Sequence, residues 1–158
     1  MRAMILAAGQ GARLRPLTNH LPKPLIKVGA QRLIEHHIHK IAQAGFDSII
    51  INTAYLGEKI AHTLGDGSRY GIRLKYSHEG TQALETGGGI AYARPLLGND
   101  PVLIVSADIY SDITFDANFD LTTGMHLIMV NNPAHHPAGD FTANELGLAD
   151  SEQRYTYS

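Results

Sequence analysis

Two glycines and two basic side chains follow an apolar run near the amino terminus. The stretch MILAAGQGARLRPLTNHLPKPL, from Met4 to Leu25, places Gly9 and Gly11 just after the run and Arg13 and Lys23 beyond them. Glycines let backbone N–H groups approach an anion closely. Arginine binds phosphate oxygens as a fork, and lysine binds them as a point charge. The spacing therefore favours a triphosphate site, although a G-x-G pattern alone is also typical of a plain turn beside a solvated basic loop.

Prolines restrain this basic loop. Pro22 and Pro24 flank Lys23, and Pro16 lies further back. Their fixed φ angles pre-organise the lysine. The common nucleotide motifs are absent, because Leu14 occupies the place of the third glycine of a dinucleotide fingerprint and no GxxxxGK[ST] occurs. A dinucleotide-binding oxidoreductase is further disfavoured because no carboxylate ends the run SIIIN.

Asp108 follows the apolar run VLIVS closely enough to lie at the carboxyl end of a strand. A carboxylate there can hold Mg²⁺ against phosphate oxygens, although aspartate is also an ordinary turn residue. The chain has no cysteine, so any metal needs carboxylate, histidine or ligand oxygens. Of the three histidines expected on one helix, only His36 and His39 share a face, and no HExxH occurs. We therefore expect no histidine metal site.

The elements that must position these residues alternate along the chain. Apolar, β-branched runs predict strands at 2–8, 48–52, 72–77 and 102–106, and helical spacing predicts helices at 31–44, near 56–64, and from the glycines of TGGGIAYARPLL onward. Gly45 is expected to end the first helix in the left-handed conformation. Repeated βαβ units predict a Rossmann-like, doubly wound, mostly parallel sheet. Ligands in such folds lie beyond the carboxyl ends of the strands.

Composition limits the class of protein. The 158 residues are 44% hydrophobic and 18% charged, as in one globular domain, and the net charge of −2 gives no reason to expect a nucleic-acid partner. The amino terminus has only a short apolar run, and no later stretch is long enough to span a membrane. We expect a cytoplasmic protein.

The stretch LAAGQGARLRPLTNHLPKPL resembles the signature of sugar-1-phosphate nucleotidyltransferases. The segments ALETGGGI, VSADIY and NNPAHHPAGDF are similar to those of the N-acetylmuramate 1-phosphate uridylyltransferase group, and the resemblance covers nearly the whole chain. It implies transfer of UMP from UTP to a sugar 1-phosphate with Mg²⁺ and release of pyrophosphate, as part of peptidoglycan recycling. Another pair of substrates, such as dTTP and glucose 1-phosphate, is the alternative.

The resemblance also implies residue roles. Arg13, Lys23 and Asp108 would be catalytic, with Arg13 on the leaving pyrophosphate, Lys23 near the α-phosphate and Asp108 on the metal. Glu79 and Asp140 would approach the sugar. The nucleotide-binding residues would be Leu6, Ala7, Ala8, Gly9, Gly11, Arg13, Lys23, Asn52, Thr86 and Gly87, with Thr86, Gly87 and Gly88 forming a loop before a helix. Ser106 and Ala107 replace the Asn-Gly often found in the family, so contacts at Ser106 stay open.

The chain is expected to form one nucleotidyltransferase domain, with a nucleotide-binding core at 1–124 and the start of a sugar-binding part at 125–158. MHLIMVNNP and RYTYS read as strands, and the sequence stops at the second. Family members continue into a part with a second magnesium aspartate, so we expect a truncated chain. The alternative function is a nucleotide-binding module with weak catalysis.

Overall fold

The structure, a computed structural model, describes residues 1–121, 124–134, 136–144, 147–149 and 156–157. It divides into two compact units, Met1–Phe119 and Asp120–Ser158. Within the described residues no helix is long and apolar enough to cross a membrane.

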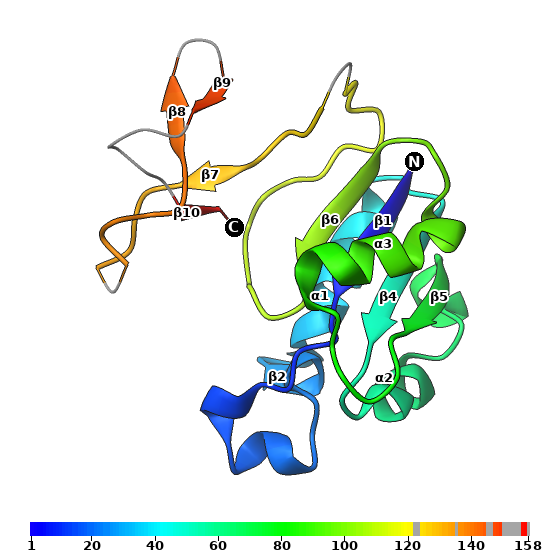
Figure 1. Cartoon of the computed structure of the whole chain (residues 1–158). Coiled ribbons are helices and arrows are strands. Elements are labelled where there is room, and N and C mark those ends of the chain that lie inside the picture. The colour runs from blue at the N-terminus through cyan, green and yellow to red at the C-terminus, as the bar shows by residue number, and fades with distance from the viewer. Residues whose placement is uncertain (122–123, 135, 145–146, 150–155, 158) are drawn as a thin grey trace. The chain divides into compact units, whose positions relative to one another are not determined.

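The first unit is built on a four-stranded parallel sheet (Figure 1). Its strands are β1 (Arg2–Leu6), β4 (Ser48–Thr53), β5 (Arg73–His78) and β6 (Val102–Ser106), in the order β5-β4-β1-β6. Leu6 of β1 lies opposite Asn52 of β4 on one side and Ser106 of β6 on the other. The chain first builds outward from β1 to β5 and then crosses back to β6. This reversal makes a topological switch point between β1 and β6, where ligands bind in such sheets.

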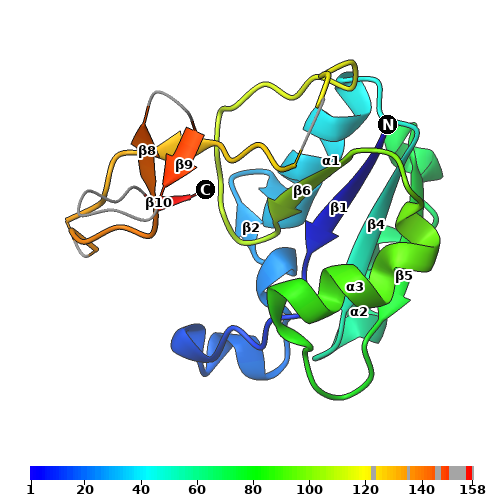
Figure 2. The ribbon, with the colours of Figure 1, turned by 45° about the horizontal axis from the view of Figure 1, so that its top comes forward.

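Helices cover both faces of this sheet. In Figures 1 and 2, α3 (Glu85–Leu97) lies on one face, and α1 (Leu33–Gln43) and α2 (Gly57–Leu64) lie on the other. Alternation along β1 explains the two layers, because Ala3 and Ile5 pack with α1 and α2 while Met4 packs with α3. The expected doubly wound parallel fold is confirmed.

Element boundaries differ from the expected ones at the functional end of the sheet. β1 ends at Leu6, because the Ala7 N–H donates to the Asn52 side chain at 2.8 Å instead of continuing the ladder. The glycines expected before a helix lie inside it, since α3 begins at Glu85. Gly45 follows α1 with φ of +83°, as expected of a left-handed cap. Short elements complete the first unit: the 3₁₀ turns Ala12–Leu14, Leu17–Asn19, Lys23–Leu25 and Ser68–Tyr70, and the hairpin of β2 (Lys27–Val28) and β3 (Gln31–Arg32).

The second unit contains two small antiparallel pairs. β7 (Met129–Val130) pairs with β10 (Thr156–Tyr157), and β8 (Thr142–Asn144) pairs with β9 (Gly147–Ala149). The strand expected in MHLIMVNNP is thus only two residues long. Arg154, Tyr155 and Ser158 of the expected RYTYS strand lie outside the described residues.

Glu35 joins the start of α1 to the 3₁₀ turn at Ser68–Tyr70. Its buried carboxylate accepts hydrogen bonds from the Arg32 N–H, from Arg69 and from the Tyr70 hydroxyl, at 2.8, 3.2 and 2.8 Å. Burial alone would raise the pKa of Glu35, but the hydrogen bonds from Arg32 and Tyr70 and the Arg32 charge outweigh it and lower the pKa. Burial and the neighbouring Glu35 raise the pKa of Tyr70 to about 12.

Glu35→Gln should lower the free energy of unfolding by roughly 1–3 kcal/mol at neutral pH, because the buried network loses its negative charge and one of its two acceptor oxygens. A folded-state pKa below the ordinary 4.5 means that the carboxylate stabilises the fold above that value and loses this effect as pH falls through the lowered pKa. Urea titrations of both proteins between neutral and acid pH should show the difference shrinking toward acid. The exposed Glu58→Gln on α2 is the control, and equal losses in both variants would contradict the assignment.

Candidate functional site

A pocket of about 320 Å³ opens at the switch point between β1 and β6. The loop after β1, the 3₁₀ turn at Lys23, the start of α3 and the residues after β6 all contribute to its wall. Its lining consists of Leu6, Ala7, Gly9, Gly11, Ala12, Arg13, Leu14, Lys23, Pro24, Thr86, Ser106, Ala107 and Asp108. The structure therefore brings Gly9 and Gly11, both predicted cations and the predicted aspartate to one place.

Gly11 sets the shape of the basic loop. Its φ is +62°, and a Cβ there would lie 3.0 Å from Thr18 Cγ2 and 3.2 Å from Lys23 Cβ. The fully buried Thr18 donates its hydroxyl to the Gly11 carbonyl at 2.9 Å. A side chain at position 11 would therefore push the glycine turn away from Lys23. Thr18 is a positioning residue that sequence reasoning missed, since nothing in the sequence distinguishes it from a solvated loop threonine.

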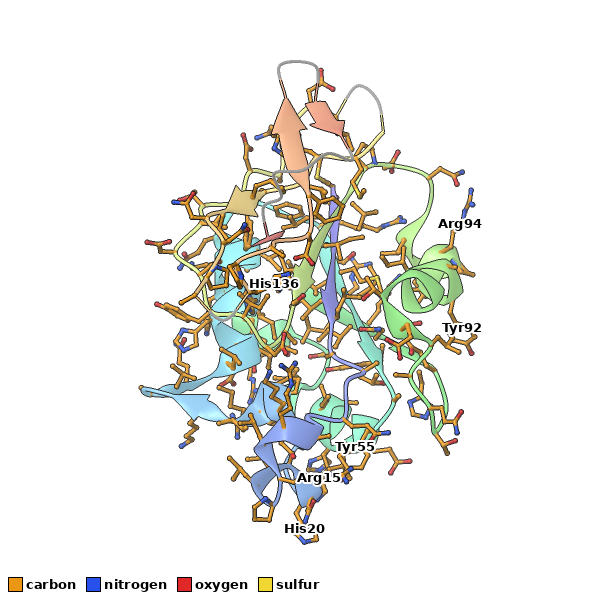
Figure 3. All side chains as sticks on the ribbon, turned by 60° about the vertical axis from the view of Figure 1, so that its left-hand side comes forward. Arg15, His20, Tyr55, Tyr92, Arg94 and His136 are labelled. Carbon is orange, nitrogen blue, oxygen red and sulfur yellow. The ribbon has the colours of Figure 1, made fainter. Side chains whose placement is uncertain are left out.

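The far part of the same loop is held by the segment after β4. Tyr55 donates its hydroxyl to the carbonyls of Thr18 and Asn19, at 3.2 and 3.0 Å, and Lys59 donates to the His20 carbonyl at 2.7 Å. Figure 3 labels Tyr55, His20 and Arg15 together at this end of the molecule. These contacts fix the loop backbone, so Arg13 and Lys23 leave a constrained segment rather than a free one.

Lys23 and Asp108 face each other across the pocket. The lysine Nζ lies 2.5 Å from the aspartate Oδ2, and the two side chains are 27% and 42% exposed. Exposure of this degree leaves both groups open to a ligand that enters the pocket. Among the described residues, Arg13 has no acidic partner, and its exposed guanidinium is free to bind an anion.

Helix α1 braces the segment that carries Asp108. His37 is buried and its Nε2 lies 2.6 Å from the Ile109 carbonyl, so Nε2 carries the proton and donates it. Burial lowers the pKa of His37 and so favours the neutral form of the imidazole. Lys40 donates to the Ser111 carbonyl, and the His36 ring meets the Tyr110 ring edge-on at a centroid distance of 5.3 Å. Helix α1 thus holds the backbone just after Asp108 through residues 109–111 and so fixes the position of the aspartate.

Several predicted site residues lie off the pocket wall. Ala8 and Gly87 are not among the lining residues, and Ala8 is buried. Asn52 is 3% exposed and bonds to Ala7 and Glu79 instead of facing the pocket. Glu79 uses both carboxylate oxygens on neighbouring protein groups. Asp140 belongs to the second unit, where its Oδ1 lies 3.2 Å from His136 Nε2.

Asp108 is the acidic residue of the pocket wall, and the described residues contain no cluster of three metal-ligating side chains. Hard cations such as Mg²⁺ take about six oxygen ligands and keep several waters. A single, partly exposed carboxylate therefore fits a metal ion that shares its coordination with the oxygens of a bound phosphate. It does not fit a metal ion held by the protein alone.

The lining also contains Ala12, Leu14, Pro24, Ser106 and Ala107, which the sequence did not single out as ligands. All five lie next to predicted residues, and they line the pocket with small or apolar side chains. Their positions follow from the turn at Gly11 and from the register of β1 with β6, which only the fold reveals.

Comparison with known proteins agrees with this geometry. Residues 2–125 match the family model described as nucleotidyl transferase. The chain is 50% identical over 98% of its length to the N-acetylmuramate alpha-1-phosphate uridylyltransferase of Neisseria meningitidis, and spans 68% of that protein. It is 41% identical over 67% of its length to the enzyme of the same name from Caulobacter vibrioides, spanning 45% of it. A Bacillus anthracis structure described as a glucose-1-phosphate thymidylyltransferase aligns with a TM-score of 0.62 and 29% identity, over 71% of this chain and 46% of that one.

Proposed function

This chain belongs to the nucleotidyl transferase family, and we propose that it transfers UMP from UTP to N-acetylmuramate 1-phosphate with release of pyrophosphate. The observation that carries the proposal is the pocket itself, in which Arg13, Lys23 and Asp108 surround a glycine loop at the switch point of a parallel sheet. The 50% identity to the Neisseria protein supports the choice of substrates.

The reaction needs no general base, because a sugar 1-phosphate is already an anionic nucleophile. One of its oxygens attacks the α-phosphorus of UTP and forms a new P–O bond. The bond from that phosphorus to the bridging oxygen breaks, and pyrophosphate leaves with the electron pair. The protein's task is to hold the reacting phosphates in line and to neutralise their charge.

The pocket residues match that task. The backbone N–H groups around Gly9 and Gly11 would bind the triphosphate oxygens, and Arg13 would neutralise the departing pyrophosphate. Lys23 would leave Asp108 and bind oxygens at the α-phosphate. Enzymes of this family generally use a divalent metal ion, and we propose Mg²⁺ held by Asp108, where it would supply positive charge to the phosphate oxygens. Thr86 would lie beside the nucleoside, and Asp140 would bind the sugar, as the family resemblance implies. With these substrates the protein would act in the cytoplasm, in peptidoglycan recycling.

The test measures pyrophosphate release from UTP in the presence of Mg²⁺ in two parallel reactions. One contains N-acetylmuramate 1-phosphate as the acceptor, and the other contains glucose 1-phosphate. We expect release with the muramic sugar, at a kcat/KM at least about tenfold above that for glucose 1-phosphate, since loss of matched polar contacts costs 1.4 kcal/mol or more. Greater release with glucose 1-phosphate, or with dTTP in place of UTP, would contradict the proposed substrates. UTP binding without any release would favour the nucleotide-binding module.

A further inference from the structure

The carboxamide of Asn52 fixes the point where β1 leaves the sheet. Its Oδ1 accepts the Ala7 N–H at 2.8 Å, and its Nδ2 donates to Glu79 Oε1 at 2.7 Å. The Ala7 amide would otherwise be left without a ladder partner in the buried end of the sheet. Since Ala7 begins the segment that leads to the glycine turn, the direction in which that segment leaves the sheet depends on one buried side chain.

Glu79 carries the connection to the opposite wall of the pocket. Its second oxygen, Oε2, accepts the Leu84 N–H at 2.7 Å. Leu84 directly precedes α3, whose first residue Glu85 has φ of +59°. Thr86 follows and lines the pocket. The series of hydrogen bonds from Ala7 through Asn52 and Glu79 to Leu84 therefore connects the β1 loop to the start of α3, and we call it the amide bridge.

Gly89 shows that α3 is packed directly on this bridge. A Cβ at position 89 would lie 2.5 Å from Glu79 Oε1 and 2.8 Å from Asn52 Nδ2, closer than real contacts allow. Gly87, in the same helix, has nothing within 4 Å of such a Cβ. The close approach thus explains one glycine of the TGGG run by packing and not by ligand binding.

We infer that Asn52 and Glu79 are positioning residues, which act on the nucleotide by holding the Ala7 and Leu84 backbones and not by touching it. The inference rests on the proposed function for the identity of the ligand, UTP. Among the described groups, the hydrogen bonds of Glu79 come from two neutral donors, the Asn52 amide and the Leu84 N–H. The bridge therefore depends on the order of hydrogen-bond donors and acceptors along it. The negative charge can be carried by the side chain at position 79 or by the one at position 52.

A reciprocal exchange tests this directly. In Glu79→Gln, the new amide can accept from one neighbour only, so its NH₂ group faces either the Leu84 N–H or the Asn52 NH₂. In Asn52→Asp, two carboxylates face each other. The double variant Asn52→Asp/Glu79→Gln restores every hydrogen bond with the central one reversed, because the carboxylate at position 52 accepts from the Ala7 N–H and from the new amide, which in turn accepts from the Leu84 N–H.

Two readouts are needed at mildly alkaline pH: UTP·Mg²⁺ affinity by calorimetry, and hydrogen exchange of the Ala7 and Leu84 amides without nucleotide. Each single variant should weaken UTP binding by about tenfold or more and speed exchange at one or both amides. The double variant should return affinity to within about threefold of the original chain and restore slow exchange. Glu58→Gln removes an exposed carboxylate on α2 and should change neither quantity.

Two results would overturn the inference. If the double variant regains slow exchange but binds UTP as poorly as Glu79→Gln, the Glu79 carboxylate contacts the nucleotide itself. If neither single variant alters exchange, there is no amide bridge in solution. Failure of the proposed function looks different, because the unaltered chain would then release no pyrophosphate from UTP with the sugar phosphate, or would bind no UTP at all. Exchange in the double variant would still show whether the bridge holds the two backbones.

Discussion

Replacement of Arg13 by alanine should lower the rate of pyrophosphate release by roughly 10²- to 10³-fold, the effect of removing one preorganised group that stabilises transition-state charge. Arg13 lines the pocket with an exposed guanidinium, and among the described residues it has no acidic partner to keep. Because the Arg13 side chain is exposed and makes no ion pair within the described part of the chain, the free energy of unfolding should stay within about 0.5 kcal/mol of the original value. Steady-state kinetics with UTP and the sugar phosphate, together with urea unfolding, provide both numbers.

Arg15→Ala is the matched control for this effect. Arg15 belongs to the same loop and carries the same charge, but it does not line the pocket, and its side chain bonds only weakly to Gln10 at 3.4 Å. The Arg15→Ala substitution should reduce the rate of pyrophosphate release only by the small, salt-sensitive amount that a distant positive charge contributes. Equal losses in the two variants would mean that Arg13 acts through the net charge of the loop and not by contact with the leaving group.

Asp108→Asn should also lower the maximal rate by about 10²-fold or more and should raise the Mg²⁺ concentration needed for half-maximal rate, because the pocket loses its carboxylate ligand. The amide keeps the size of the side chain. The ion pair between the original Asp108 carboxylate and Lys23 is partly exposed, so its loss should cost at most about 1 kcal/mol of stability. The measurement is the rate as a function of Mg²⁺ concentration.

Asp112→Asn serves as the control in that experiment, since Asp112 is an exposed aspartate four residues further along the chain. It should leave both the maximal rate and the Mg²⁺ dependence unchanged. An Asp108→Asn protein with an unaltered Mg²⁺ dependence would show that the metal ion is held elsewhere.

Much of the fold could be predicted from local patterns. The strands expected at 48–52 and 102–106 and the helix expected at 31–44 were confirmed to within a few residues. Parallel strands covered on both faces leave continuous β-branched runs, and amphipathic helices leave a 3.6-residue period. The order of the strands has no such signal. Only the structure shows that β6 pairs with β1, and this pairing brings Asp108 opposite Lys23 although 85 residues separate them.

Two differences between expectation and structure near the site have physical causes. Thr86, Gly87 and Gly88 were expected in a loop before a helix, since a run of three glycines disfavours a helix, yet tertiary packing of Gly89 against the amide bridge holds this run in α3. The family resemblance placed Asn52, the last residue of the run SIIIN, among the nucleotide ligands, and the structure shows its side chain bonded to Ala7 and Glu79. A side chain that ends a strand can instead close the sheet's own hydrogen bonds, and the sequence does not distinguish these roles.

The most direct measurement of the central claim is where UTP lies when it binds. In ¹H–¹⁵N spectra of this 17.2 kDa chain, Mn²⁺ can replace Mg²⁺ on oxygen ligands and broaden the resonances of nearby amides. We predict that UTP with Mn²⁺ broadens the amides of Gly9, Gly11 and Asp108 most strongly, and that Mn²⁺ without UTP does so far less. Broadening centred on any other part of the chain, or an unchanged spectrum, would contradict a nucleotide site between β1 and β6.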